Sequence, residues 1–280
     1  MIDVFTFMAA PIAACIVLVL MHAYLGAHIL SRGVIFVDLA LAQIAALGAA
    51  LAVLAGYDLH SPEALAASLG ATLFGAGLFA LTRSHRADLP HEALIGIVYV
   101  VAAAASVLVL DRSPHGAEHL KTVLVGQILW VSWTDVGIAS AVYAVVGVLH
   151  WIFRRRFLGL SGLDPSPAGQ QNGPTRHSRW WDFLFYVSFG LVFTVSVPIA
   201  GVLLVFSFLI VPAVCAVLFG GQLSSRLMIA WAIGSAVSIV GCAMSFGFDT
   251  PTGATIVCAF GAVLTMLGLW RSLAYRMSMR

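Results

Sequence analysis

The chain has 280 residues, of which 61% are hydrophobic and only 9% are charged. A soluble domain carries about 25% charged residues, so this composition provides too little charge to cover a water-facing surface and excludes a soluble enzyme domain. The net charge of +2 is too small to favour binding of nucleic acid. The sequence therefore predicts an all-α, polytopic integral membrane protein with lipid around its helices and no nucleic-acid partner.

Apolar stretches of about 20 residues, the length that a helix needs to cross a bilayer core, follow one another along the chain. We expect spans at 5–27, 34–56, 62–82, 92–110, 133–153, 181–197, 199–219, 226–245 and 251–270. The sixth and seventh spans meet at Ser196–Pro198–Gly201 with almost no loop, so a broken or hairpin element there would leave eight spans and a re-entrant segment. Residues 118–131 are less apolar and are expected to form an interfacial or re-entrant piece. Residues 1–280 are thus expected to be a single transmembrane domain of eight to nine helices.

Lysine and arginine gather in alternate loops, as the positive-inside rule requires of cytoplasmic segments. With the N-terminus outside and nine spans, 12 of the 14 basic residues fall on the cytoplasmic side, and only Arg112 and Lys121 fall outside. We therefore expect the N-terminus outside and the C-terminus in the cytoplasm. The longest polar segment, 154–180, is then cytoplasmic, as a linker or as a contact for a soluble partner.

The sequence lacks the phosphate-binding loop that binds a nucleotide in many ATPases. A phosphate-binding loop, GxxxxGK[ST], needs a lysine after a glycine, but the single lysine, Lys121, follows Leu120. We expect the chain not to be an enzyme and to hold no permanently bound cofactor. Any ATP must then be hydrolysed by a separate subunit.

Asp38 lies inside the second apolar span, where a lone carboxylate costs about 2.5–3.5 kcal/mol on insertion scales. Such a residue usually faces a cavity or a partner, which makes Asp38 a candidate for the translocation pathway and for metal binding. The alternative is that Asp38 caps the helix start at the membrane interface. Small residues recur in the same span, at Gly48, Ala52 and Gly56 and at Ala42, Ala46 and Ala50. They indicate either a tightly packed helix beside a pathway or ordinary helix packing.

Histidines offer a second candidate for metal binding. His115 and His119 lie in the outer segment 111–121 and would share a face if that piece were helical, a spacing suited to a soft-to-borderline metal. The alternative is a solvated loop. His22, His28 and His150 are expected to be single interfacial or packing residues. The cysteines, Cys15, Cys215, Cys242 and Cys258, are expected to be small buried hydrophobes.

Five stretches, in order, resemble the permease subunits of metal-type ABC importers, which carry zinc, manganese or iron. They are SRGVIFVDLALAQIAALGAALA, EALIGIVYVVAAAASVLVL, HLKTVLVGQILWVSWTDV, GVLLVFSFLIVPAVCAVLF and FGFDTPTGATIVCAFGAVL, and with their spacing they cover nearly the whole chain. The resemblance implies the transmembrane subunit of an ATP-driven importer that moves a divalent metal ion across the bacterial cytoplasmic (inner) membrane. It also implies three partners: a cytoplasmic ABC ATPase, an extracytoplasmic metal-binding protein and a second copy of the chain in a homodimer.

The stretch LSGLDPSPAGQ, within 154–180, resembles the D-P-x-x-A element of that family. In the family this element forms the coupling helix that docks in a groove of the ATPase. By this resemblance, Asp164, Pro165 and Ala168 are expected to contact the ATPase. Pro167 and Gly169 are poor helix formers and depart from the family element.

The second span departs from the family pattern, in which an aspartate and a histidine four residues apart face the metal path. Alignment on Gly48 places Leu39 at the aspartate position and Gln43 at the histidine position, with Asp38 one residue early. Gln43 is thus the second candidate for the pathway, but glutamine is a poor replacement for imidazole as a zinc ligand. Two alternatives stay open: an ABC permease for a non-metal substrate, and a secondary transporter driven by an ion gradient.

Overall fold

The computed structural model describes residues 4–58, 61–82, 91–112, 124–163 and 176–278, and no residue in these ranges forms a β-strand. The helices are α1 (Val4–Arg32), α2 (Val37–Leu54), α3 (Pro62–Thr82), α4 (His91–Leu110), η1 (Ile128–Trp130), α6 (Trp133–Ile152), α7 (Arg154–Leu160), α8 (Arg176–Phe219), α9 (Leu223–Phe248) and α10 (Thr252–Ser278). Eight helices in the described part are long and apolar enough to cross a membrane. The predicted all-α, multi-pass membrane protein is confirmed.

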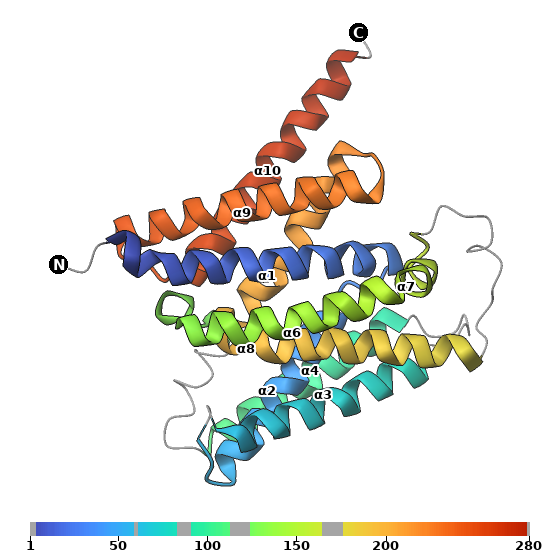
Figure 1. Ribbon diagram of the computed structural model, residues 1–280, viewed down its shortest axis with the longest axis vertical. Helices are drawn as coiled ribbons and strands as arrows, with labels where there is room; N and C mark the ends of the chain where they lie inside the picture. Colours follow the sequence, from blue (N-terminus) through green and yellow to red (C-terminus); the bar gives the residue numbers. More distant parts are fainter. Residues whose placement is uncertain (1–3, 59–60, 83–90, 113–123, 164–175, 279–280) are drawn as a thin grey trace.

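The long helices run to and fro between the two ends of one bundle (Figure 1). One end holds the last turn of α1 with Arg32, the short helix α7 with Arg154, and the first turn of α9; we call it the arginine-rich end. The opposite end holds the first turns of α1, α3, α6 and α10. The start of α1 and the end of α10 therefore lie toward opposite ends of the bundle.

α8 is helical throughout except at Gly201, whose φ of 76° and ψ of 158° break the helix. The first segment of α8, 176–200, runs away from the arginine-rich end, and the second segment, 202–219, returns toward it at an angle (Figure 1). α8 is one of the eight candidate membrane helices among the described residues, and Gly201 divides it into two segments. The broken element, which the sequence analysis left as an alternative to two separate spans, is therefore present, with its break at Gly201, while Pro198 stays within the helix.

Two glycines bring separate pieces of backbone into direct contact at the break. A Cβ built on Gly201 would lie 2.3 Å from the nitrogen of Gly126, and one built on Gly126 would lie 2.2 Å from the carbonyl carbon of Ala200. The backbone N–H of Gln127 also donates a hydrogen bond to the carbonyl of Ile199 at 3.2 Å. The segment 124–131, with η1, thus packs on the turn of α8 and pairs one of its backbone groups.

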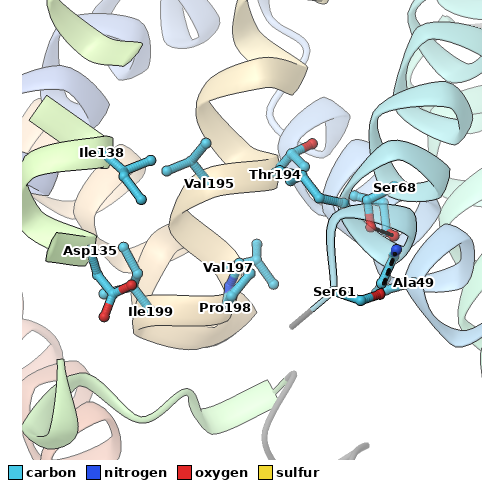
Figure 2. A pocket seen from close by; sticks show the side chains of 14 residues that line it. Ala49, Ser61, Ser68, Asp135, Ile138, Thr194, Val195, Val197, Pro198 and Ile199 are labelled. Carbon is cyan, nitrogen blue, oxygen red and sulfur yellow. Dashed lines mark hydrogen bonds between the residues drawn. The ribbon is translucent and has the colours of Figure 1, made fainter. Parts of the chain in front are cut away.

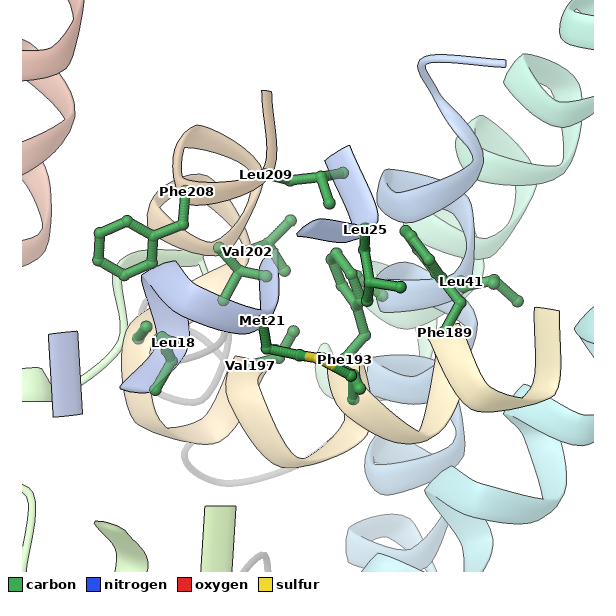
Figure 3. Packing of buried hydrophobic residues seen from close by; sticks show 14 of the residues in the cluster. Leu18, Met21, Leu25, Leu41, Phe189, Phe193, Val197, Val202, Phe208 and Leu209 are labelled. Atoms are coloured by element: carbon green, nitrogen blue, oxygen red, sulfur yellow. The ribbon is translucent and has the colours of Figure 1, made fainter. Parts of the chain in front are cut away.

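α1 packs against both segments of α8 and anchors the apolar core (Figure 3). Its residues Leu18 and Leu25 are fully buried. Phe189 and Phe193 of the first α8 segment stack with ring centroids 4.7 Å apart. Lipid tails are as apolar as these side chains, so close van der Waals packing, rather than exclusion of water, holds the helices together.

The outer surface of the bundle is apolar. Large exposed side chains on α4, α6 and α10 include Ile97, Val100, Leu108, Val145, Trp151, Met266, Leu269 and Trp270. Only 22% of the most apolar stretch of α10 is buried inside the protein. This helix leans away from the others (Figure 1). These faces suit contact with lipid or with another membrane-embedded chain.

The predicted spans agree with the helices at their centres and differ at their ends. α1 continues to Arg32 and α10 continues to Ser278, so both helices extend beyond their apolar runs into polar residues. Within the polar segment 154–180, the described residues are helical at both ends, in α7 and at the start of α8.

The expectation that all four cysteines are buried is wrong for Cys258, which is exposed on α10.

Replacing Gly201 with alanine should destabilise the protein. The new methyl group would overlap the backbone of Gly126, and alanine at a φ of 76° is strained, so a loss of more than about 1 kcal/mol is expected. The apparent melting temperature in detergent, followed by size-exclusion chromatography of heated samples, measures the change. Gly137→Ala on α6 is the matched control, because a Cβ there meets nothing within 4 Å. Equal melting temperatures for the two variants would contradict the backbone contact at the break.

Candidate functional site

Asp38 is a buried carboxylate at the start of α2, with a side chain that is 0% exposed. Among the described residues neither of its carboxylate oxygens has a hydrogen-bond partner. The positive end of the helix dipole favours a carboxylate in this first turn. Asp38 therefore lies at the helix start, as the capping alternative required, but inside the protein rather than at its surface.

One face of α2 carries alanines in line with Asp38. Asp38, Ala42, Ala45 and Ala49 follow one another at helical spacing, so their side chains share a face. Gln43 is also buried, but it lies about 140° around the helix from Asp38. The structure thus places both predicted pathway residues inside the protein without bringing them to one face.

Small residues on another side of α2 serve helix packing. A Cβ built on Gly48 would lie 2.6 Å from the carbonyl oxygen of Ala67 on α3. Gly75 of α3 has a similar role, because a Cβ there would lie 2.6 Å from Cδ1 of Ile44. Gly48 therefore serves ordinary close packing, whereas Gly56 is exposed beyond the end of α2, where a Cβ would meet nothing within 4 Å, and Ala46 belongs to the wall of a cavity.

A cavity of about 240 Å³ lies between α2, α3, α6 and the first segment of α8, toward the end of the bundle opposite the arginines (Figure 2). Its polar groups come from Ser61 and Ser68 of the α3 region, Asp135 of α6 and Thr194 of α8. Alanine, valine, isoleucine, leucine and proline form the rest of the wall. Because Ala45 and Ala49 line it, the alanine face of α2 continues from this cavity toward Asp38.

Asp135 is positioned by the start of α6. Its Oδ2 accepts hydrogen bonds from the backbone N–H of Ser132 at 3.0 Å and from the Ser132 hydroxyl at 2.6 Å. In return the backbone N–H of Asp135 donates to the Ser132 hydroxyl, which completes a capping box. The sequence prediction missed Asp135, although the spacing of Ser132 and Asp135 before an apolar run is the signal of such a box.

Two buried histidines, His22 and His150, form hydrogen bonds between α1, α6 and the first segment of α8. Nε2 of His22 lies 3.1 Å from the hydroxyl of Ser196, which is also 2.5 Å from the hydroxyl of Tyr143. His150 is within 3.1 Å of the Tyr24 hydroxyl and 2.9 Å of the Ser188 hydroxyl. These polar side chains join helices across the bundle.

All three histidines, His22, His28 and His150, are buried packing residues, which was one of the two expected roles, but His28 and His150 lie together rather than singly. The rings of His28 and His150 lie 6.3 Å apart between centroids, and Tyr24 lies 4.9 Å from His28. Phe157 of α7 stacks on His150 at 4.1 Å. Residues far apart in the sequence meet here, and helical spacing within one span gives no signal of such a meeting.

Arg32 ties the end of α1 to α7 and α8 at the arginine-rich end. Its guanidinium forms an ion pair with Asp182 at 3.1 Å, and the two side chains are 0% and 5% exposed. Its Nε donates to the hydroxyl of Ser161 at 3.0 Å, and the Nδ1 of His28 lies 2.8 Å from the same hydroxyl. The guanidinium carbon also lies 3.7 Å from the ring centroid of Phe185. This network fixes the residues that lead into segment 164–175.

Several predicted site residues lie outside the described residues. They are the metal candidates His115 and His119 and the coupling candidates Asp164, Pro165 and Ala168. Within the described ranges, no group of three or more histidine, cysteine, aspartate or glutamate side chains could hold a metal ion. The described polar groups around the cavity are hydroxyls and one carboxylate.

Comparisons with known proteins place this fold and sequence in one family. The ABC 3 transport family pattern matches residues 4–272. The chain belongs to the ABC 3 transport family. It is therefore the transmembrane subunit of an ABC transporter, and its predicted resemblance to such permeases is confirmed.

Relatives of this ABC 3 family chain include bacterial membrane proteins named for metals. A probable iron transport system membrane protein of Haemophilus influenzae is 28% identical over 253 residues, covering 90% of this chain and 89% of the relative. The manganese transport system membrane protein MntC of Listeria innocua is 26% identical over 235 residues, covering 83% and 79%.

Two solved structures share the fold of this family member. PsaBC from Streptococcus pneumoniae in complex with Fab matches with a TM-score of 0.75 at 23% identity, covering 94% of this chain and 91% of the other. A transporter described as of metal-chelate type, in an inward-facing conformation, matches with a TM-score of 0.72 at 15% identity, covering 96% and 90%.

Breaking the Arg32–Asp182 pair from one side should be costly. Arg32→Met leaves the buried carboxylate of Asp182 without its cation, and removal of one partner from such a pair costs about 3–5 kcal/mol. The double variant Arg32→Met, Asp182→Leu removes both charges and should recover most of the lost melting temperature. A single variant as stable as the wild type would contradict the role of this pair.

Proposed function

We propose that this chain is the permease of an ATP-driven importer for a divalent metal ion, with manganese or iron as the cargo. The observation that supports this proposal most strongly is the family match over residues 4–272. Relatives named for manganese and iron also align with most of the chain. The polar lining of the cavity supports this cargo, because hydroxyl and carboxylate oxygens suit manganese better than softer metals.

In this proposal the metal enters the cavity at the extracytoplasmic end. Hydroxyls of Ser61, Ser68 and Thr194 and the carboxylate of Asp135 give it oxygen contacts in place of water. The alanine face of α2 leads from there to Asp38, whose buried carboxylate attracts a cation. Gln43, about 140° around α2 from Asp38, offers a neutral oxygen on another side of the helix.

The proposed orientation puts the arginine-rich end in the cytoplasm of a bacterium, with the chain in the inner membrane. The N-terminus then lies outside and the C-terminus inside. An extracytoplasmic metal-binding protein delivers the ion to the end that carries the cavity. Two copies of the chain form a homodimer through their exposed apolar faces, and two ABC ATPase subunits dock at the cytoplasmic end.

The proposed docking element is the segment with Asp164, Pro165 and Ala168. Arg32 and His28 hold Ser161, which lies a few residues before this segment. A movement of the docking segment caused by the ATPase would therefore be transmitted to α1 and α8 through buried hydrogen bonds. ATP binding and hydrolysis on the partner subunit then switch the path between outward and inward access.

A non-metal substrate is the second candidate function. Leu39 at the aspartate position and Gln43 at the histidine position favour it, since the usual ligand pair is missing. In vesicles with the ATPase, energised uptake of another solute without any uptake of manganese or iron would establish this candidate instead.

Asp38→Asn should abolish most metal uptake and leave the fold intact. The substitution keeps the shape of the side chain and removes its charge, so manganese uptake by proteoliposomes with the ATPase and ATP should fall about tenfold or more. Asp249→Asn is the matched control, because Asp249 is an exposed carboxylate with a φ of 51°, a conformation that asparagine adopts readily. Normal uptake by Asp38→Asn would contradict the assigned path. Uptake by the chain without ATPase or ATP would contradict the ABC mechanism.

Changing the coupling segment should uncouple the two subunits. In Asp164→Lys combined with Ala168→Arg, a reversed charge and a large side chain replace the proposed contact surface, so the ATPase should no longer co-purify with the permease. The melting temperature of the permease alone should stay unchanged, which separates a lost contact from a lost fold. Undiminished co-purification would show that the ATPase docks elsewhere.

A further inference from the structure

Two hollows meet at the first turn of α9, one on each side of Leu223. The larger, a groove of about 530 Å³, lies between α1, α6 and α9. The smaller, of about 360 Å³, lies between α1, the second segment of α8 and α9. Leu223 lines both, so the two hollows adjoin at the arginine-rich end of the bundle.

Each hollow carries one arginine in a wall that is otherwise almost entirely apolar. Arg154 lines the groove, and its guanidinium carbon lies 4.9 Å from the ring centroid of Trp151. Arg226 lines the smaller hollow, where its Nε is buried and has no hydrogen-bond partner among the described residues. No acidic side chain is among the described residues that line either hollow. The two cations therefore lack a counter-charge within these walls.

A buried, charged N–H without an acceptor is unfavourable, so a ligand that brings acceptor oxygens would be stabilised here. The apolar walls select against a freely soluble anion, which would lose its water without gaining further polar contacts. The same apolar walls suit the acyl chains of a lipid. Exposed Trp151 and the indole of Trp231, whose Nε1 donates to the Leu20 carbonyl at 2.9 Å, are of the kind that lies at a membrane–water interface.

On the orientation proposed above, with the arginine-rich end in the cytoplasm, we propose that the two hollows form a binding site for an anionic phospholipid of the cytoplasmic leaflet. Its phosphate lies between Arg154 and Arg226, and its acyl chains lie in the groove between α6 and α9. Basic pockets between transmembrane helices on the cytoplasmic side bind anionic head groups. A bound lipid would fill the space between α6 and α9, both of which pack on α1.

Native mass spectrometry of the full chain, released from mild detergent, tests this proposal. The probes are dioleoylphosphatidylglycerol, dioleoylphosphatidylcholine and glycerol 1-phosphate at equal concentration. Phosphatidylglycerol should bind the wild type at least fivefold more than phosphatidylcholine, and glycerol 1-phosphate should not displace it. Arg154→Gln and Arg226→Gln should each weaken binding of phosphatidylglycerol about fivefold, the effect expected of one arginine near an anionic lipid.

Arg271→Gln is the matched control, because Arg271 is exposed on α10 and lines neither hollow. Ala144→Phe fills the groove without changing charge and should also lower phosphatidylglycerol binding, which keeps the test valid if Arg226→Gln fails to fold. Equal binding of the two lipids, displacement by glycerol 1-phosphate, or an equal loss in Arg271→Gln would overturn the proposal. The readout is lipid binding alone, so it does not depend on the identity of the cargo.

Discussion

Backbone polar groups inside lipid must find partners within the protein, and the turn of α8 meets that requirement at the cost of severe sequence constraints. Gly201 breaks the helix, Gly126 lets a second piece of backbone approach, and the N–H of Gln127 pairs with the carbonyl of Ile199. A side chain at either glycine would separate the two pieces and leave that carbonyl without this donor. The return of the second α8 segment depends on this contact, and with it the packing of α1 between the two segments.

The distribution of polar groups separates a packing region from the cavity region that we propose as part of the metal path. The buried histidines of α1 and α6 bond to serine and tyrosine hydroxyls on neighbouring helices and hold those helices together. The cavity beside α2 and α3 instead presents oxygen atoms and small apolar side chains. An oxygen-lined path binds a divalent ion weakly, which suits an ion that must leave again, whereas a full set of imidazoles or thiolates would hold it.

The sequence allowed prediction of the helical membrane fold and the approximate spans, because apolar length and punctuation are local properties. The break near Gly201 and the position of Asp38 at a helix start were each one of two alternatives that the sequence left open. The meeting of His28 with His150 and the Arg32–Asp182 pair could not be predicted, because they depend on which helices are neighbours. Asp135 left a local signal in its capping box, but only the fold shows that this box borders a cavity.

Arginines at one end of the bundle have different surroundings, although the positive-inside rule counts them alike. Arg32 is buried and neutralised by Asp182, so its charge holds α1, α7 and α8 together. Arg154 stacks on Trp151, and Arg226 keeps a buried Nε without an acceptor in the described part of the chain. A charge that is paired within the protein contributes little to attraction of the surrounding membrane, whereas unpaired charges attract anionic head groups. The burial and partners of each arginine, rather than their number, therefore separate the cations that stabilise the fold from those available to lipid or to an ATPase.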